Sequence, residues 1–261
     1  MKRFIVCILT FIFAIGTIGC SMMEENNPST SLPQQQNDSN TVQSQSVEET
    51  QTKPVETKRE AYEVIYQKGT VYHNSIGTTW VQAVIQIENT GSEPLYLNSS
   101  SADLENNEGK LVKTLSLLSA YPTVLLPGET ALLVEDTTLD NDPGVEELNV
   151  IPHLDIAKAK VECIRYNISD LSLENEQYGG IKMLGRVENN TTEVGSMVYV
   201  VANLYDANHN GIGQLFTILT NDLNPGEKIG FTLTCLSAPD SLTVENVASY
   251  EVFAFPLQFQ F

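Results

Sequence analysis

The fold is decided by one stretch of the chain, Val81-Gln82-Ala83-Val84-Ile85-Gln86-Ile87-Glu88. Apolar side chains stand at positions 81, 83, 85 and 87, while polar side chains stand at 82, 86 and 88. The side chains of a β-strand point alternately to its two faces, so the pattern predicts a strand with one face in a core and the other in water. Ile181 to Glu188 repeats the alternation. No stretch after residue 60 shows a helical stripe over three turns, so the predicted fold class is all-β.

A duplication organises this part of the chain. The sequence Ile87-Glu88-Asn89-Thr90 returns as Val187-Glu188-Asn189-Asn190, and Leu126-Pro127-Gly128-Glu129 returns as Asn224-Pro225-Gly226-Glu227. The spacing is 100 positions for the asparagines and 98 for the prolines, which is the size of one sandwich domain. Each Pro-Gly pair predicts a type II turn. We therefore expect two tandem immunoglobulin-like β-sandwich domains, residues 61–157 and 158–261.

The beginning of the chain reads as an export signal. Lys2 and Arg3 precede an apolar run from Phe4 to Ile18, and Gly19-Cys20 marks an abrupt change to polar sequence. This is the order of parts in a secretory signal. The block Thr17-Ile18-Gly19-Cys20 resembles a bacterial lipobox, with Thr17 where Leu is usual, which implies a signal peptide over 1–19 and lipidation of Cys20. The alternative is an uncleaved membrane helix near the lower length limit for a span.

Residues 20–60 predict a disordered tether. After Cys20 the segment holds no aromatic residue and many Gln, Asn, Ser, Thr and Glu. Such a composition buries too little apolar surface to offset the entropy of ordering. The predicted localisation is extracytoplasmic, with the folded part held at the cell membrane through the lipid on Cys20.

The net charge bears on the possible partners of the protein, and the cysteine count bears on disulfide formation. The net charge of −19 becomes −21 once Lys2 and Arg3 are cleaved off, so we expect no nucleic-acid partner. An acidic surface also commonly serves solubility alone. Beyond the signal and Cys20 only Cys163 and Cys235 remain, which we interpret as two buried thiols, a disulfide being the alternative.

Part of the second repeat is similar to a known family. Leu204-Tyr205-Asp206 follows a predicted strand and is flanked by Gly185-Arg186-Val187-Glu188-Asn189 and by Asn224-Pro225-Gly226-Glu227. This resembles the FxLYD domain of bacterial cell-surface proteins, with Ala202 in place of the Phe, over about residues 160 to 261. The first repeat resembles related immunoglobulin-like domains of Gram-positive lipoproteins, and it has Ser101-Ala102-Asp103 near the place of Leu-Tyr-Asp. The resemblance implies a fold and a location, and it transfers no catalytic site.

Two acidic segments are weak candidates for cations. Asp206, Asn208 and Asn210, followed by Gly211, have the oxygen spacing of the first half of an EF-hand loop, but Thr217 stands where the bidentate acid belongs. A hairpin turn is the preferred interpretation. The second acidic segment contains Glu135, Asp136, Asp140, Asn141 and Asp142. We interpret it as a solvated loop rather than a cation site.

The sequence contains no recognisable set of catalytic residues. We therefore expect a protein that is not an enzyme and that has neither a cofactor nor a firm metal site. The preferred function is a non-catalytic surface module that contacts an envelope protein or wall polymer. The alternative is a small-ligand, cation-binding or proteinase-inhibitor module, for which Asn221 to Glu227 and Leu139 to Gly144 are the candidate loops. Two further features are expected to be structural. Trp80 should lie in a core or at its rim, and the run from Tyr250 to Phe261 should be the closing strand, which Pro256 confines to a sheet edge or a bulge.

Overall fold

The computed structural model describes residues 61–74, 76–176, 180–235 and 238–258. The predicted signal peptide, Cys20 and the predicted tether lie outside the described residues. Within them the regular structure consists of antiparallel strands and one short 3-10 helix, η1 (Val244–Asn246), so the prediction of an all-β fold is confirmed. No helix among the described residues is long and apolar enough to cross a membrane.

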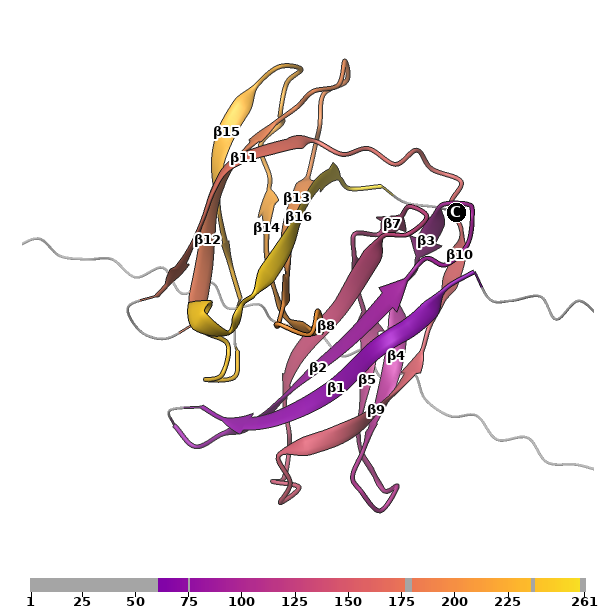
Figure 1. The fold of residues 1–261 in the computed structure, drawn as a ribbon, viewed down its shortest axis with the longest axis vertical. Coiled ribbons are helices and arrows are strands. Elements are labelled where there is room, and N and C mark those ends of the chain that lie inside the picture. The colour runs from indigo at the N-terminus through magenta and orange to yellow at the C-terminus, as the bar shows by residue number, and fades with distance from the viewer. Residues whose placement is uncertain (1–60, 75, 177–179, 236–237, 259–261) are drawn as a thin grey trace, which may run out of the picture. The chain divides into compact units, whose positions relative to one another are not determined.

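The first ten strands form what we call the N-terminal lobe (Figure 1). Seven of them make one sheet in the order β5-β4-β9-β1-β2-β8-β6, and three make a small sheet in the order β10-β3-β7. The strands are β1 (Glu63–His73), β2 (Thr79–Glu88), β3 (Leu95–Leu97), β4 (Ser100–Glu105), β5 (Leu111–Leu118), β6 (Ala120–Tyr121), β7 (Val124–Leu125), β8 (Thr130–Thr138), β9 (Glu147–His153) and β10 (Ile156–Lys158).

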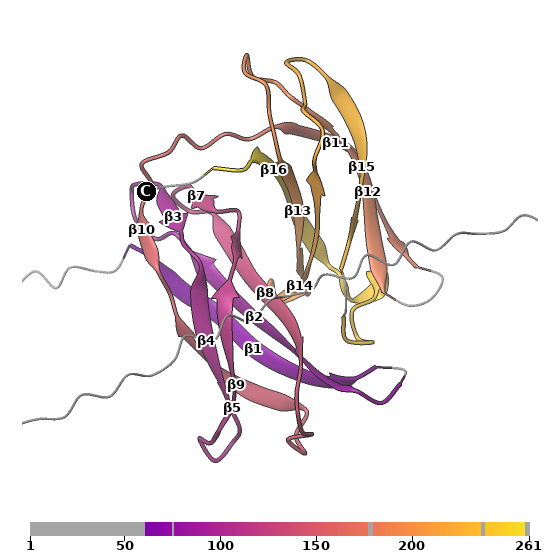
Figure 2. The same cartoon turned by 180° about the vertical axis from the view of Figure 1, so that it is seen from behind.

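The remaining six strands form the C-terminal lobe, whose sheet order is β11-β12-β15-β14-β13-β16 (Figure 2). Strand β16 ends at Pro256 and lies at the edge of the sheet, where a proline is tolerated, so the prediction of a closing strand is confirmed as far as Pro256, while residues 257 and 258 are outside the strand. The strands are β11 (Asn167–Asn175), β12 (Ile181–Glu188), β13 (Val198–Tyr205), β14 (Gly211–Leu219), β15 (Lys228–Thr234) and β16 (Ser249–Pro256).

The two lobes repeat one strand arrangement. In the N-terminal lobe the triplets are β1-β2-β8 and β5-β4-β9, and in the C-terminal lobe they are β11-β12-β15 and β14-β13-β16. Side chains from both triplets of a lobe meet in one apolar cluster, so each lobe packs its two triplets face to face. The triplets are joined by different strands, since β1 pairs with β9 in the first lobe and β14 pairs with β15 in the second.

The duplicated asparagines have the same role in both lobes. Asn89 Nδ2 donates to the carbonyls of Glu93 and Leu125, each at 2.9 Å. Asn189 Nδ2 donates to the carbonyls of Glu193 and Leu223, at 2.7 and 2.8 Å. Both side chains are buried at the end of a strand, so each satisfies carbonyl groups that water does not reach.

The Pro-Gly pairs form the predicted turns. In each turn the fourth residue donates its N–H to the carbonyl of the first, from Glu129 to Leu126 at 3.0 Å and from Glu227 to Asn224 at 2.9 Å. Gly128 and Gly226 have φ of 79° and 74°, the left-handed backbone that the third position of a type II turn requires. The local sequence therefore predicts these turns correctly.

The segment equivalent to Leu-Tyr-Asp in the first lobe differs from the expected one. Asp206 Oδ1 accepts from the N–H groups of Asn208 and Asn210, and Asn106 Oδ1 accepts in the same way from Glu108 and Lys110. The counterpart of Leu204-Tyr205-Asp206 is thus Leu104-Glu105-Asn106. Ser101-Ala102-Asp103, the segment expected near that place, lies earlier in β4.

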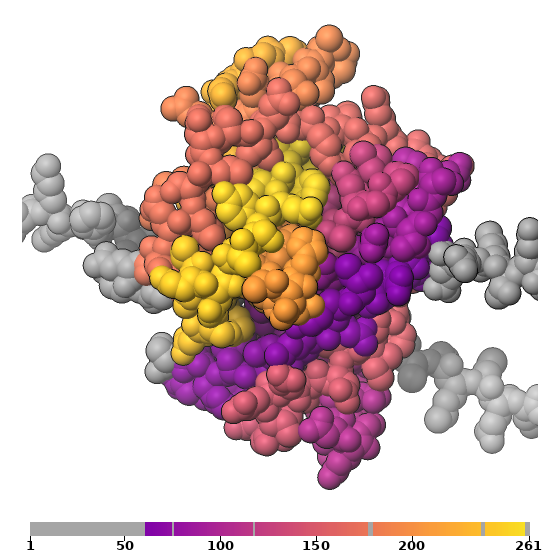
Figure 3. Space-filling view, in the orientation of Figure 1, coloured from indigo at the N-terminus to yellow at the C-terminus, as the bar shows by residue number. Residues whose placement is uncertain are grey.

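The prediction that the outer face of β2 lies in water is wrong. The alternation predicts that Gln82 and Gln86 face water, but both are buried, and Gln86 is 0% exposed. The C-terminal lobe covers this face of the sheet, where Val84 packs with Leu132 and with Tyr205 of the other lobe. In Figure 3 orange atoms near the β13–β14 turn lie against purple atoms of the N-terminal lobe. Both faces of β2 are therefore buried.

Candidate functional site

The contact between the lobes, which we call the interlobe face, has a small apolar centre. Val84 and Leu132 come from adjacent strands, β2 and β8, and Tyr205 comes from the end of β13. All three are buried, and Tyr205 is 0% exposed. Packing of this kind fixes the lobes against each other, but three residues provide only a small apolar area.

Amide side chains surround this centre and cross between the lobes. Gln86 accepts at Oε1 from Gly211 N at 2.9 Å and donates to the carbonyl of His209 at 3.3 Å. In the opposite direction, Asn203 Nδ2 donates to the carbonyl of Tyr121 at 3.0 Å, and Gln214 Nε2 donates to that of Leu132 at 3.3 Å. Buried amides with partners stabilise one specific docking arrangement, because any shift leaves them unpaired.

A hydroxyl and carboxylate cluster closes one side of the interlobe face. The Tyr205 hydroxyl donates to Glu251 Oε2 at 2.8 Å and lies 3.1 Å from the Thr130 hydroxyl oxygen. Burial raises the pKa of Tyr205, so its hydroxyl remains protonated and acts as the donor. Tyr205, the tyrosine of the Leu-Tyr-Asp segment, is therefore a docking residue in this protein.

Arg165 joins the segment between the lobes to both of them. Its guanidinium donates to the carbonyl of Val124 at 2.6 Å and lies 3.5 Å from Glu129. The same group lies over the rings of Phe253 and Phe255, 5.4 and 5.6 Å from their centroids. Because its side chain is only 24% exposed, these charge and ring contacts hold the connecting segment against both lobes.

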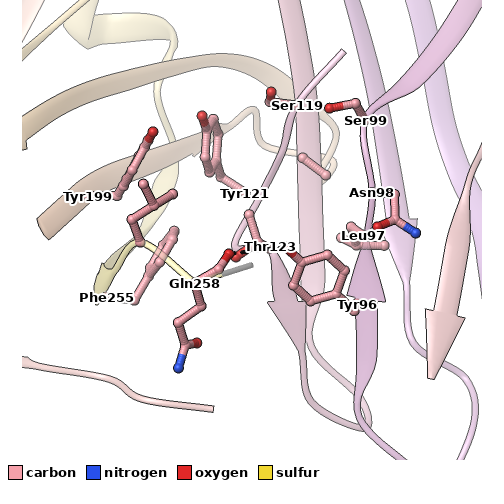
Figure 4. A pocket seen from close by; sticks show the side chains of 12 residues that line it. Tyr96, Leu97, Asn98, Ser99, Ser119, Tyr121, Thr123, Tyr199, Phe255 and Gln258 are labelled. Carbon is pink, nitrogen blue, oxygen red and sulfur yellow. Dashed lines mark hydrogen bonds between the residues drawn. The ribbon is translucent and has the colours of Figure 1, made fainter. Parts of the chain in front are cut away.

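A hollow that we call the aromatic cavity opens where the lobes meet (Figure 4). Its volume is about 330 Å³, within the lower range of small-molecule sites. The N-terminal lobe contributes Tyr96 and Tyr121, and the C-terminal lobe contributes Tyr199 and Phe255. Tyr199 stacks on Phe255 with centroids 5.9 Å apart and on Tyr121 at 5.7 Å. Neither lobe alone contains this set of rings.

The predicted cation residues of the β13–β14 turn are engaged in the turn itself. Asp206 accepts from the backbone N–H of Asn208 and from the backbone N–H and Nδ2 of Asn210, at 2.8 to 3.1 Å. Desolvation raises the pKa of Asp206, but these hydrogen bonds outweigh it and the pKa is lowered. The described part of the chain contains no group of three or more His, Cys, Asp or Glu placed to hold a metal ion.

The second acidic segment is divided between two environments. Glu135 and Asp136 lie on strand β8, whereas Asp140, Asn141 and Asp142 follow in a loop. Asp142 is 3.2 Å from His73 Nε2 and accepts from Gly144 N. Asp136 instead lines a second hollow between the lobes, of about 270 Å³, together with Gln214, Phe216 and Cys235. Burial raises the pKa of Asp136 to about 7, although hydrogen bonds from Gln82 and Tyr72 act against the rise.

The other candidate residues have structural surroundings. Cys163 and Cys235 are free thiols, each partly buried. The candidate loop from Asn221 to Glu227 is fixed by the bonds of the Asn224 N–H and Nδ2 to Glu227 Oε2, both at 2.9 Å. Trp80 is half-buried at the start of β2 and stacks on Tyr72 with centroids 6.4 Å apart.

Sequence reasoning missed the aromatic cavity. Its rings come from positions near 96, 121, 199 and 255, and no local pattern connects them. One signal was present: Tyr199 stands between Val198 and Val200, so an aromatic side chain occupies the face of β13 opposite its core residues. The chain matches no protein-family model and no curated protein.

Proposed function

We propose that the chain is a non-catalytic, lipid-anchored extracytoplasmic lipoprotein whose two lobes together form a binding surface for an envelope protein or a wall polymer. The observation that carries the proposal is the aromatic cavity at the lobe junction, because a hollow built from both lobes needs them to be held in one arrangement. The amide bridges of the interlobe face and Arg165 supply that arrangement. The resemblance of residues 160 to 261 to FxLYD domains supports the same class.

The anchor is tested by matched cysteine variants of the full chain expressed in a Gram-positive host. Cys20→Ala removes the proposed lipid acceptor, whereas Cys7→Ala changes a cysteine inside the proposed signal peptide. We expect the parent and Cys7→Ala to partition into the detergent phase and to incorporate labelled palmitate. Cys20→Ala should do neither. Equal partitioning of the two variants would contradict the lipid anchor.

The binding surface is tested by crosslinking on living cells. A photoreactive residue in place of Ser99 lies on the rim of the aromatic cavity, and one in place of Glu108 lies in the turn at the other end of β4. The six residues of β4 separate these positions by roughly 20 Å, so the second position is a control at the far end of the strand. We expect a discrete adduct, identified by mass spectrometry, from Ser99 and none from Glu108. Equal yields at both positions, or none at either, would overturn the proposal.

A further inference from the structure

The lining of the aromatic cavity is uncharged. All of its residues are aromatic, aliphatic, hydroxyl or amide in type, although the whole chain has a net charge of −19. A charged ligand gains no ion pair inside this cavity, and an anionic one is also repelled by the surrounding field. An anionic ligand is therefore disfavoured, and the hydroxyl and amide groups of the lining favour a neutral ligand.

The rings of the cavity are held in place before any ligand enters. Phe255 is almost parallel to Tyr199, with 6° between the ring planes, and Arg165 lies over the Phe255 ring. The Tyr96 hydroxyl donates to the carbonyl of Gln258 at 3.1 Å, which joins the two walls. Rigid rings offer flat apolar contact at a small cost in conformational entropy.

Polar groups stand opposite and beside these rings. Figure 4 shows the side chains of Ser119 and Ser99 across Tyr121 from Tyr199 and Phe255, whereas the Asn98 amide donates to Asp155 Oδ1 at 3.1 Å. Hydroxyl and amide groups both donate and accept hydrogen bonds. They suit a ligand whose own groups also do both, and such a ligand must have an apolar face for the rings as well.

We propose that the aromatic cavity binds a neutral saccharide, with the C–H groups of one sugar ring against the packed rings of Tyr199, Tyr121 and Phe255 and its hydroxyl groups toward the serine side chains. A pyranose combines an apolar ring face with a rim of hydroxyls, which is the pairing that the cavity offers. The volume of about 330 Å³ has room for a mono- or disaccharide. This inference rests on the proposed function and names the wall polymer as the partner.

The test is a titration of the purified full chain in detergent micelles, followed by tyrosine fluorescence and calorimetry. The probes are N,N′-diacetylchitobiose and cellobiose as neutral sugars, glucuronic acid as an anionic sugar, and a proline-rich decapeptide. Tyr199→Ala removes the stacking ring and Tyr199→Phe retains it. Tyr250→Ala is the matched control, because Tyr250 is an exposed aromatic on β16, the strand that also carries Phe255.

We expect a neutral disaccharide to bind and glucuronic acid to bind more weakly. Tyr199→Ala should weaken disaccharide binding by about tenfold or more, while Tyr199→Phe and Tyr250→Ala should change it less than about threefold. Melting temperatures measured for each variant separate loss of the ring from loss of the fold.

Two results would overturn the saccharide assignment: no neutral sugar binding up to about 10 mM, or binding that Tyr199→Ala leaves unchanged. Preference for the peptide would overturn it as well. If Ser99 crosslinks an envelope protein while sugars fail to bind, the proposed function stands and only the ligand class falls. If sugars bind and no crosslink forms on cells, the saccharide site stands and the surface role fails.

Discussion

Asp136 is an acid in a place where its charge is unfavourable. Its carboxyl lies between the lobes with Tyr72 and Gln82 as hydrogen-bond partners, and burial raises its pKa from 3.8 to about 7. The folded protein therefore keeps the proton between about pH 4 and pH 7, while the unfolded chain releases it. Stability contributed by the protonated form is present at low pH and is lost as the pH rises through this window.

We expect Asp136→Asn to remove that loss. A shift of this size corresponds to about 4 kcal/mol at most. Because Asp136 is partly exposed, water screens part of it, and we expect a gain of about 1 to 2 kcal/mol at pH 8. For a folded part of this size the gain raises the melting temperature by about 2 to 8 °C at pH 8, and the difference from the parent disappears near pH 4.

The control for this prediction is Asp140→Asn, which changes an exposed acid of the neighbouring loop. Thermal melts of the parent and both variants at half-unit steps from pH 4 to pH 8 give the comparison. A parent and an Asp136→Asn protein with parallel stability curves across that range would show that Asp136 is ionised in the fold.

At the scale of the element, the same asparagine stabilises the end of β2 and of β12. Asn189 donates to two carbonyls and accepts from the N–H of Thr191 at 2.9 Å, and Asn89 does the same with Gly91 N at 3.0 Å. Asn189→Ala leaves these buried groups without partners. We expect it to lower the free energy of unfolding by about 2 to 4 kcal/mol.

Chemical denaturation of the full chain measures this loss. Asn208→Ala is the matched control, because Asn208 is exposed in the β13–β14 turn, and it should cost less than about 0.5 kcal/mol. Asn89→Ala should reproduce the cost of Asn189→Ala in the other lobe. Equal, small effects of all three substitutions would mean that water replaces the buried bonds.

The elements that the sequence predicts correctly are those whose cause is local. The alternation around Ile85 identifies β2, and the Pro-Gly pairs identify their turns, because the backbone geometry follows from neighbouring residues. The burial of Gln82 and Gln86 does not follow in this way. An amide on the outer face of a strand normally indicates water, but the partners of Gln86 are His209 and Gly211 of the C-terminal lobe, more than 100 positions later.

At the scale of the whole molecule, close approach between the lobes depends on Gly211. A Cβ atom at this position would lie 2.7 Å from Leu132 Cδ2 and 3.2 Å from Val84 Cγ1, both in the other lobe. Gly211→Ala therefore inserts a methyl group into the interlobe face, where both neighbours are buried. We expect docking to weaken by about 1 to 3 kcal/mol.

Calorimetry and small-angle scattering report on this change. The parent should melt in one transition, whereas Gly211→Ala should show a broader or divided transition and a larger radius of gyration. Gly230→Ala is the control, since the nearest atom to a Cβ there is 3.9 Å away, within the C-terminal lobe. If Gly211→Ala melts and scatters like Gly230→Ala, the interlobe face is not tight at this point.

The aromatic cavity was beyond prediction for a related reason. In the sequence, each ring of the cavity has the pattern of an ordinary strand residue. The rings lie together only because the lobes dock as they do; they belong to Tyr96, Tyr121, Tyr199 and Phe255. Docking in turn depends on amides whose partners are distant in the sequence. The sequence of this chain therefore predicts its fold class, whereas the aromatic cavity can be identified only from the three-dimensional structure.

Most hydrogen bonds across the interlobe face end on main-chain atoms. The groups that pair with Gln86, Asn203, Gln214 and Arg165 are the carbonyls of His209, Tyr121, Leu132 and Val124 and the N–H of Gly211. Main-chain atoms are the same whatever side chain a residue carries. The accepting residues can therefore change their side chains without losing these bonds, while the packed residues Val84, Leu132 and Gly211 still restrict the sequence. We expect a chimaera with an exchanged N-terminal lobe to assemble where the counterparts of Gln86, Val84 and Leu132 are retained.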